Sequence, residues 1–151
     1  MSLPTHLTLE IVTPDRALVQ EEVDEVQLPG TEGYLGILPG HTPLLTSLRV
    51  GQLWYRKGTE KFYLSVAFGF AEVLPDRVRL LARIAERAEE IDVTRAEEHK
   101  RKAEEALQAA KAGNADIDMD RARVSLMKAL TRLQVASRAS AHASSRAKKR
   151  N

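Results

Sequence analysis

Four basic residues in the C-terminal half of the sequence have a spacing that suits the binding of a polyphosphate. Arg95 and Lys102 are seven residues apart, and in a helix they share one face. Lys128 and Arg132 are four apart and share a face as well. An antiparallel hairpin that turns near residue 114 would bring the two pairs together. Clustered cations repel one another unless an anion lies between them, and a triphosphate supplies one. The alternative is an ordinary solvated basic surface.

The sequence offers little support for an enzyme. Its 151 residues include no cysteine and only four scattered histidines, which excludes disulfides, thiolate metal sites and cysteine nucleophiles. No glycine-rich phosphate loop precedes a lysine, and there is no His-Glu metal motif. We therefore expect no catalytic residue, no metal site and no required cofactor.

The first 88 residues have the alternation of an antiparallel β-sandwich. Leu7, Leu9 and Ile11 alternate with polar residues. The last strand is expected to bury Val78, Leu80, Ala82 and Ile84 and to expose Arg77, Arg79, Leu81 and Arg83. Turn signals such as Pro29-Gly30 and Pro75-Asp76 separate further short runs. These runs are Val23 to Leu28, Gln52 to Arg56, Phe62 to Val66 and Phe70 to Leu74.

From Asp92 onward the period becomes that of an α-helix. Thr94 with Glu97 fits a capping box, and Asp92 is an alternative cap. Gly113-Asn114 is expected to end this helix, and a second helix is expected to begin near Asp116 or Asp118. The two helices make an antiparallel hairpin.

The predicted apolar stripes of the hairpin are mostly alanine. They comprise Ala96, His99, Ala103, Ala106, Leu107 and Ala110 on the first helix, and Ala122, Leu126, Ala129, Leu130, Leu133 and Ala136 on the second. Alanine seams bury little apolar area, so the hairpin is expected to be held weakly and either to dock loosely on the sheet or to move between partners. The alternative is a permanently docked pair of helices.

Charge and composition predict three parts. Residues 1–90 hold 9 basic and 13 acidic residues, whereas residues 91–151 hold 14 and 8. We expect a sandwich over residues 1–88, a hairpin over 89–137 and a basic disordered tail over 138–151. The longest apolar run, Val66 to Leu74, is too short to span a bilayer, and the N-terminus does not resemble a secretory signal. A cytoplasmic location is therefore expected.

The segment Gly33 to Leu44 combines three glycines with two prolines and predicts a rigid loop. It resembles the glycine-proline-histidine signature of the epsilon subunits of bacterial F-type ATP synthases. Leu9 to Pro14, Gly69 to Val73 and Ala85 to Ala96 resemble further segments of that family in the same order, so the resemblance covers residues 4–137. Phe68 is a departure, because the family commonly has two glycines there.

The resemblance implies a ten-stranded sandwich followed by a two-helix hairpin, in a non-catalytic rotor subunit of the central stalk. The implied partners are the gamma subunit, the c-ring loops and, when the hairpin extends, the alpha/beta catalytic head. No nucleic acid is expected, and membrane contact is expected only through partners. The implied location is peripheral, on the cytoplasmic face of the bacterial plasma membrane.

By position, one loop resembles the segment that meets the c-ring or gamma subunit. The candidate residues of this loop are Thr31, Glu32 and Tyr34, and two further candidates, His41 and Thr42, are expected to lie beside it. An aromatic side chain such as Tyr34 in a glycine-rich turn is typical of an interface anchor. For His41 the alternative is a hydrogen bond to the neighbouring turn.

The segment Ile91 to Ala96 resembles the ATP-binding motif of the family. By that resemblance Ile91 and Ala96 contact adenine, Asp92 accepts a hydrogen bond from it, and Glu86 binds from the sandwich edge. The phosphates would be held by Arg95, Lys102, Lys128 and Arg132. Two of these are lysines where nucleotide-binding relatives carry arginine, which is expected to weaken affinity. The alternatives are that Asp92 only caps a helix and that Arg95 pairs with Glu98 or Asp92.

The expected function is therefore to couple c-ring rotation to the catalytic head and to inhibit ATP hydrolysis through the hairpin. ATP, with or without magnesium, is expected as a regulatory ligand that shifts the population of hairpin states. The alternative is an anionic-polymer or nucleic-acid binding module that uses the basic C-terminus.

Overall fold

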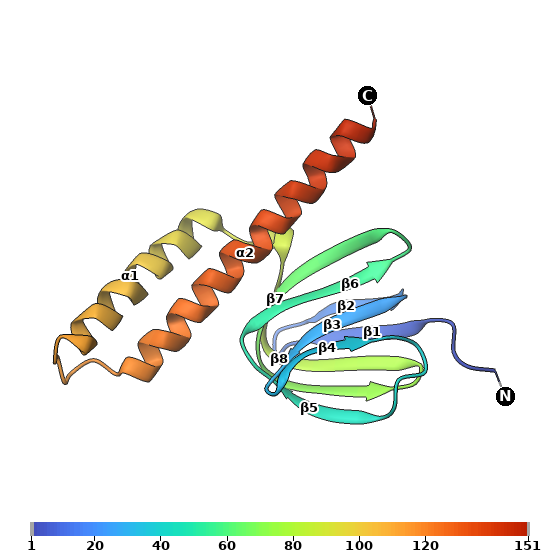
Figure 1. The fold of residues 1–151 in the computed structure, drawn as a ribbon, viewed down its shortest axis with the longest axis horizontal. Coiled ribbons are helices and arrows are strands. Elements are labelled where there is room, and N and C mark those ends of the chain that lie inside the picture. Colours follow the sequence, from blue (N-terminus) through green and yellow to red (C-terminus); the bar gives the residue numbers. More distant parts are fainter. Residues whose placement is uncertain (1, 151) are drawn as a thin grey trace. The chain divides into compact units, whose positions relative to one another are not determined.

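The computed structural model describes residues 2–150, apart from the side chains of residues 142 and 143. The chain divides into two compact units, Met1–Arg87, built of strands, and Ala88–Asn151, built of helices (Figure 1). The strands are β1 (Leu7–Val12), β2 (Ala17–Val23), β3 (Glu25–Gly30), β4 (Gly33–Ile37), β5 (Leu44–Leu48), β6 (Gly51–Lys57), β7 (Glu60–Leu74) and β8 (Arg77–Arg87).

Two long strands join the layers of the sandwich. The strand order is β2-β1-β8-β7-β5-β3-β4, with β6 paired to β3 and β7. β7 pairs with β6 through residues 60–66 and with β5 through residues 69–73, while β8 follows it along most of its length. The resemblance implied ten strands, and eight are described because β7 and β8 each run through both layers. Among the described strands, only β1 and β8 pair in parallel.

Two predictions about local elements change. The runs Phe62 to Val66 and Phe70 to Leu74 form one strand, β7. The segment Gly33 to Leu44, expected to be a rigid loop, contains all of β4 and the first residue of β5. Its glycines and prolines indicated a loop, but β4 pairs with residues Val26 to Gly30 of β3 in an antiparallel ladder.

A left-handed backbone at Phe68 and Gly69 lets β7 change its inward face. Leu64 and Val66 belong to the hydrophobic core before this point, and Ala71 and Val73 after it, so the core positions switch from even to odd numbers. A regular strand would put these two sets on opposite faces. Phe68 has φ 62° and Gly69 has φ 115°. These two left-handed residues rotate the strand, so that the opposite set of side chains points inward after them. Both halves of β7 therefore pack side chains into the same core.

The predicted alternation of β8 is wrong at its last member. Val78, Leu80 and Ala82 are buried as expected, whereas Ile84 is 49% exposed and Ala85 packs against the core instead. Ala82 lies opposite Gly69 in the β7–β8 ladder. β8 therefore changes its inward face where β7 does.

The helical unit is a hairpin of α1 (Val93–Lys111) and α2 (Met119–Lys149), preceded by the short 3-10 helix η1 (Ala88–Glu90) (Figure 1). Asp92 caps α1 by accepting a hydrogen bond from the Arg95 backbone N–H at 3.1 Å. Asp118 caps α2 in the same way. Gly113, at φ 98°, follows the end of α1 as predicted. The acidic caps therefore set the helix starts.

An alanine seam joins the two helices. Its buried members recur every seven residues and are Ala96 and Ala103 on α1, and Ala122, Ala129 and Ala136 on α2. Seven residues are close to two helical turns, so each set forms one line, and the small side chains allow close helix packing. His99, predicted in this stripe, is exposed, and Leu130 is 44% exposed. Val135, which the predicted stripe omitted, is fully buried.

The prediction of a disordered tail is wrong for residues 138–149, because α2 continues to Lys149. This segment contains no glycine or proline and is rich in alanine, lysine and arginine, which favour helices. The cations of its last turn, Arg146, Lys148 and Lys149, also interact favourably with the helix dipole. Residue 151 lies outside the described part of the chain.

Asp24 ties three segments of the sandwich together. Its carboxylate accepts a hydrogen bond from the Gly58 backbone N–H at 2.6 Å and lies 3.1 Å from Nδ1 of His6. Arg56 approaches it at 3.9 Å. The Gly58 hydrogen bond, together with His6 and Arg56, holds the pKa of Asp24 below its ordinary value.

We expect Asp24→Asn to lower the melting temperature at pH 7, and this difference to shrink below about pH 4. A carboxyl whose pKa is lower in the folded protein stabilises it above the unfolded pKa, and this stabilisation is lost as the pH falls through the folded pKa. Thermal denaturation followed by circular dichroism measures the effect. Asp15→Asn, in an exposed turn, is the control. An Asp24→Asn deficit that is constant with pH would exclude the charge as its cause.

Candidate functional site

The turn between β3 and β4, together with the start of β4, presents an aromatic side chain in a fixed position. Tyr34 is 48% exposed, and the guanidinium of Arg49 lies 4.9 Å from the centre of its ring. A Cβ at Gly51 would crowd Pro29 and the Tyr34 hydroxyl, so Gly51 leaves room for this packing. Thr31, in the same turn, donates its backbone N–H to Ser47 at 3.0 Å. Tyr34 is thus exposed but held in place, as an interface anchor requires.

His41 and Thr42 lie at the other end of β5. The backbone N–H of Gly40 donates to Pro75 at 2.7 Å, which fixes this loop beside the β7–β8 turn. Thr31 contacts Ser47, at the far end of β5, so the structure does not bring the two candidate loops together. Protonated Nδ1 of His41 donates to the Thr42 carbonyl at 2.6 Å. This hydrogen bond is the alternative predicted for His41.

The outer face of the sheet carries an apolar strip that the sequence analysis missed. In this face Phe70 of β7 pairs with Leu81 of β8, and Leu81 pairs with Val12 of β1. Phe70 is 57% and Leu81 is 55% exposed, and Leu45 on β5 is 72% exposed. We define Phe70, Leu81 and Leu45 as the apolar strip. In the sequence, the only indication of this strip was Leu81, a leucine among arginines on the face of β8 that was expected to be exposed to solvent.

An ion pair borders the apolar strip. Nε of Arg79 donates to the Glu10 carboxylate at 2.9 Å, and Arg79 lies two residues before Leu81 on the same face of β8. Glu72 faces Arg79 on one side and Leu45 on the other in the strand register. An apolar centre with a charged border is the usual composition of a protein–protein interface.

The predicted phosphate-binding cations border the alanine seam of the hairpin. Arg95 and Lys102 each directly precede a buried alanine of α1, and Lys128 directly precedes Ala129 of α2. Lys102 pairs with Glu98 at 3.2 Å, and this hydrogen bond lowers the pKa of Glu98. Glu98 was the partner proposed for Arg95 in one of the sequence alternatives.

The predicted adenine contacts are largely enclosed. Ile91 is 8% exposed and Ala96 fully buried, while the Asp92 carboxylate serves as a helix cap. Glu86 belongs to β8 in the other unit, and Arg132 is half-buried on α2. In this conformation the structure offers adenine little open surface at Ile91 and Ala96.

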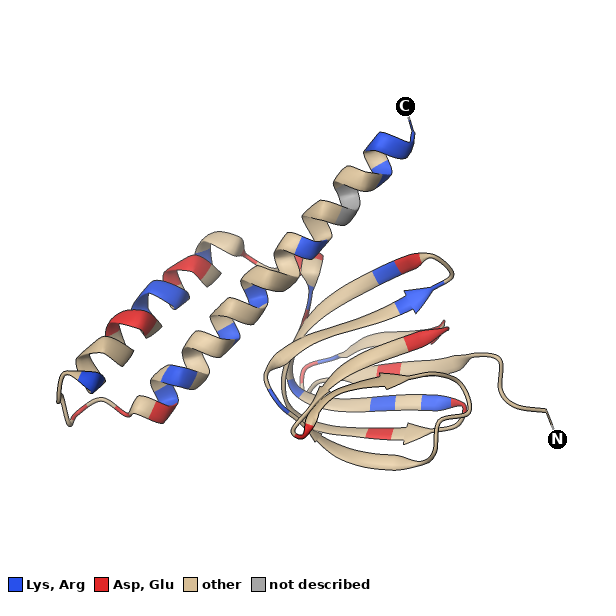
Figure 2. Ribbon diagram, in the orientation of Figure 1, with Lys and Arg blue, Asp and Glu red and all other residues tan. Residues whose placement is uncertain are grey.

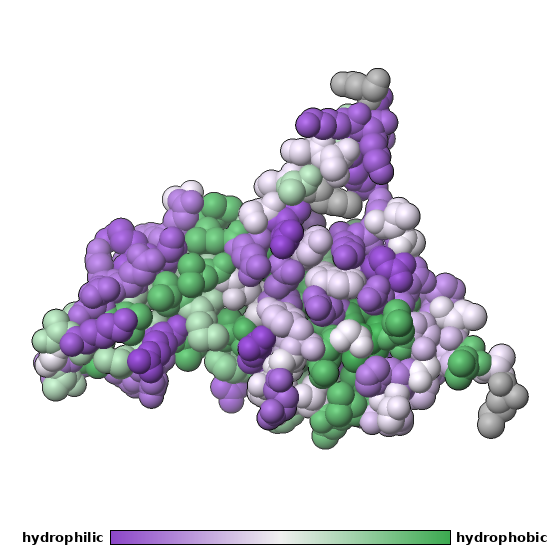
Figure 3. All heavy atoms as spheres, viewed as in Figure 1, coloured by the Kyte–Doolittle hydropathy of each residue, from purple (hydrophilic) through white to green (hydrophobic). Residues whose placement is uncertain are grey.

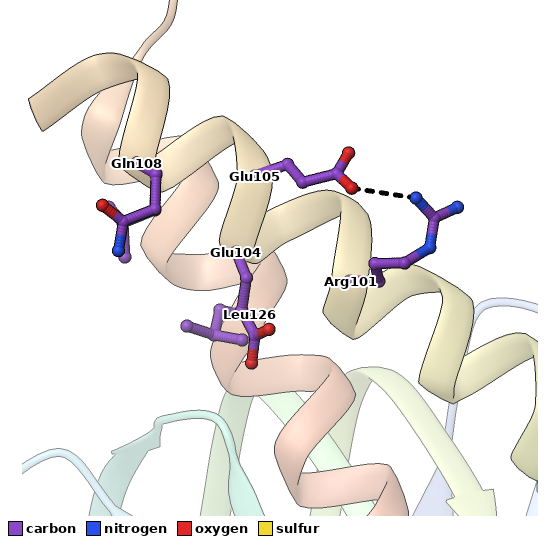
Figure 4. A pocket seen from close by; sticks show the side chains of 6 residues that line it. Arg101, Glu104, Glu105, Gln108 and Leu126 are labelled. Atoms are coloured by element: carbon purple, nitrogen blue, oxygen red, sulfur yellow. Dashed lines mark hydrogen bonds and ion pairs between the residues drawn. The ribbon is translucent and has the colours of Figure 1, made fainter. Parts of the chain in front are cut away.

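A hollow of about 730 Å³ lies elsewhere on the hairpin (Figure 4). Its lining is Arg101, Glu104, Glu105, Leu107, Gln108 and Leu126. Arg101 and Glu105 close an ion pair of 2.9 Å at its rim. None of the predicted ATP-binding residues lines it. Hydrophobic residues are visible along the hairpin between hydrophilic outer surfaces (Figure 3).

Two sequence models of one family match the chain. The model of the ATP synthase delta/epsilon chain β-sandwich domain matches residues 6–88, and that of its long α-helix domain matches residues 89–137. Among the described residues no group of three or more acidic, histidine or cysteine side chains could hold a metal. No described helix is long and apolar enough to cross a membrane.

Curated relatives agree with these models. The ATP synthase epsilon chain of Koribacter versatilis is 57% identical over 66% of this chain and 70% of its own length. Epsilon chain 2 of Syntrophotalea carbinolica is 45% identical over 87% and 94%, and the chain from Herpetosiphon aurantiacus is 48% identical over 86% and 93%. A chain of the Euglena gracilis mitochondrial ATP synthase shares the fold, with a TM-score of 0.73, 23% identity and coverage of 84% and 79%.

A β-sandwich with an appended helical hairpin therefore defines a non-catalytic stalk subunit of ATP synthase, part of a membrane-associated complex. The chain belongs to the delta/epsilon family of ATP synthase subunits, and the curated relatives named above are ATP synthase epsilon chains.

Proposed function

We propose that this stalk subunit couples rotation of the c-ring to the catalytic head, with its sandwich fixed to the gamma subunit through the apolar strip. This proposal rests on the exposure of three large apolar side chains on the outer face of the sheet, those of Phe70, Leu81 and Leu45. Burying what remains exposed of these three side chains would contribute about 3–5 kcal/mol. A partner that covers them gains that free energy without disturbing the core.

The loop of Thr31, Glu32 and Tyr34 is proposed to contact the c-ring. Its support is the packing of Arg49 on Tyr34, which reduces the conformational entropy that the side chain would lose on binding. His41 and Thr42 lie at the opposite end of β5, so we assign them a separate contact with the stalk. The subunit would then sit peripherally on the cytoplasmic face of the bacterial plasma membrane, held there by its partners.

Mixing the purified chain with gamma, and separately with detergent-solubilised c-ring, tests this proposal. Size-exclusion chromatography with light scattering should give a one-to-one complex with gamma. A chain that elutes unchanged in the presence of gamma at micromolar concentration would contradict the proposal. The c-ring alone is expected to bind more weakly, because the loop is small.

The hairpin is proposed to regulate ATP hydrolysis. Its support is the alanine seam, because alanine side chains bury little area and hold a helix pair weakly. A hairpin that opens could extend to the alpha/beta head and block rotation in the hydrolysis direction. ATP bound at the folded hairpin would favour that state over the inhibitory one. The contacts proposed for the nucleotide are Glu86, Ile91, Asp92, Arg95, Ala96, Lys102, Lys128 and Arg132.

We expect the chain to bind ATP weakly and Arg95→Ala to weaken binding by at least about tenfold. A charge-assisted hydrogen bond contributes roughly 1.5–3 kcal/mol, which is tenfold or more in affinity. Isothermal titration calorimetry with and without magnesium measures it. Arg101→Ala is the control, since Arg101 is an exposed arginine of α1 paired with Glu105. No binding at millimolar ATP, or equal losses in both variants, would count against this site while leaving the stalk role intact.

A further inference from the structure

The second helix is basic along nearly its whole length. After Asp120 the sequence contains no acidic residue up to its last position, and it contains nine lysines and arginines. Figure 2 shows this as blue segments along α2, with red only near its start. On α1, by contrast, acidic and basic residues are interspersed and form ion pairs such as Lys100–Glu104. The charge of α2 is therefore not balanced within its own sequence.

The end of α2 takes no part in the hairpin seam. We define residues 138–150 as the C-terminal arm; its cations are Arg138, Arg146, Lys148, Lys149 and Arg150. The seam ends at Ala136, and none of the described side chains from Ser137 to Arg150 is buried. The model of the family's helical domain stops at residue 137. The arm is about 20 Å long at 1.5 Å per residue.

The helix of the arm is weakly supported. The Ser137 hydroxyl donates to the Gln134 carbonyl at 2.7 Å, and the Ser140 hydroxyl to the Ala136 carbonyl at 3.3 Å. Such bonds from serine to the preceding turn slightly destabilise a helix. Four cations within the last five described residues also repel one another. An anionic partner would relieve that repulsion and stabilise the helix.

The composition of the arm narrows the kind of anion. Between residues 138 and 150 there is no phenylalanine, tyrosine or tryptophan and no apolar side chain larger than alanine. The arm therefore lacks the large aromatic side chains that form stacking platforms for nucleic-acid bases, and it has no large apolar side chain to insert into a bilayer core. Binding would depend on charge alone, which favours a surface of many mobile negative charges over a partner of fixed shape.

We propose that the C-terminal arm binds the anionic headgroups of phospholipids at the bilayer surface. The chain belongs to a membrane-associated complex, so such a surface is available within the assembly. Clusters of four to eight basic residues are typical of binding to anionic lipids. This contact is direct, in contrast to the expectation that the membrane is reached only through partners. It does not depend on the proposed ATP site.

Co-sedimentation of the full chain with vesicles of phosphatidylcholine and about 30% phosphatidylglycerol tests the proposal. The arm variant is Arg146→Ala, Lys148→Ala, Lys149→Ala and Arg150→Ala. The control removes four cations from α1: Lys100→Ala, Arg101→Ala, Lys102→Ala and Lys111→Ala. Each lysine or arginine near an anionic surface strengthens binding about fivefold, so the arm variant should bind at least about a hundredfold more weakly. The control should stay within a few-fold of the unchanged chain.

Salt, vesicle composition and a competing polyanion distinguish headgroup binding by the arm from a general effect of net charge and from RNA binding. Binding should fall steeply with salt and disappear on vesicles of pure phosphatidylcholine, and the helical circular dichroism signal should rise on anionic vesicles. Equal losses in the arm variant and the control would overturn the proposal, because the net charge of the chain would then account for binding. Tighter binding of single-stranded RNA than of vesicles at equal phosphate and about 0.15 M salt would also overturn it, in favour of a nucleic-acid partner.

Discussion

Gly69→Ala is expected to lower the free energy of unfolding of the sandwich by at least about 4 kcal/mol, which is a large fraction of the roughly 5–15 kcal/mol by which a typical domain is stable. A Cβ at this position collides with the backbone carbonyl of Leu81 and crowds Ala82, and backbone atoms cannot move aside as a side chain could. The residue also has φ 115°, which costs an alanine a further 1–3 kcal/mol or so. Relieving the collision would separate β7 from β8 at the point where both strands change their inward face.

Two other glycines provide matched controls for this change. Gly58 has φ 62° but open space around its Cβ direction, so Gly58→Ala should cost only about 1–2 kcal/mol. Gly36 has neither constraint, and Gly36→Ala should be within about 1 kcal/mol of the unchanged chain. Urea denaturation followed by Trp54 fluorescence measures all three. Equal losses for Gly69→Ala and Gly58→Ala would refute the close contact with Leu81.

Leu81→Asp is expected to weaken binding to the gamma subunit about a hundredfold while leaving the sandwich folded. Leu81 is 55% exposed and pairs directly with Phe70, so the change removes apolar area from the centre of the apolar strip. It also puts a carboxylate where a bound partner would exclude water, and an unpaired buried charge costs several kcal/mol. Isothermal titration calorimetry with purified gamma gives the affinity.

Ile84→Asp is the control for this second prediction. Ile84 lies on the same strand and is 49% exposed, but it belongs to the part of β8 beyond the change of inward face. Its effect on gamma affinity should be less than about threefold. Equal effects of the two substitutions would mean that the apolar strip is not the interface. If Leu81→Asp loses thermal stability, the gamma affinity of a second variant, Phe70→Asp, shows instead whether the apolar strip is the interface.

The sequence predicted the parts of the fold that depend on regular periods. Alternation at Leu7, Leu9 and Ile11 gives β1, and the alanine stripes give the seam of the hairpin. Asp92, one of the predicted cap alternatives, caps α1, and Asp118, one of the two predicted starting points of the second helix, caps α2. A short acidic side chain before a helix has a definite chemical role, because it accepts hydrogen bonds from the first backbone N–H groups.

The failures occurred where a local pattern depends on distant contacts. The change of inward face at Phe68 depends on how β7 reaches two layers, and alternation alone cannot show it. For the same reason Ile84 was wrongly assigned to the core. The C-terminal arm was predicted to be disordered because charge was given more weight than the helix propensity of its alanines. The ATP-binding residues stay a prediction.

Covalent cross-linking from the apolar strip tests the central claim most directly. The chain has no cysteine, so Phe70→Cys creates a unique attachment point for a short photoreactive maleimide. After assembly into ATP synthase and illumination, we expect a cross-link to the gamma subunit from position 70 and little from Ile84→Cys. A cross-link from position 70 to the c-ring alone, or none to any subunit, would contradict the proposed attachment of this sandwich to the rotating stalk.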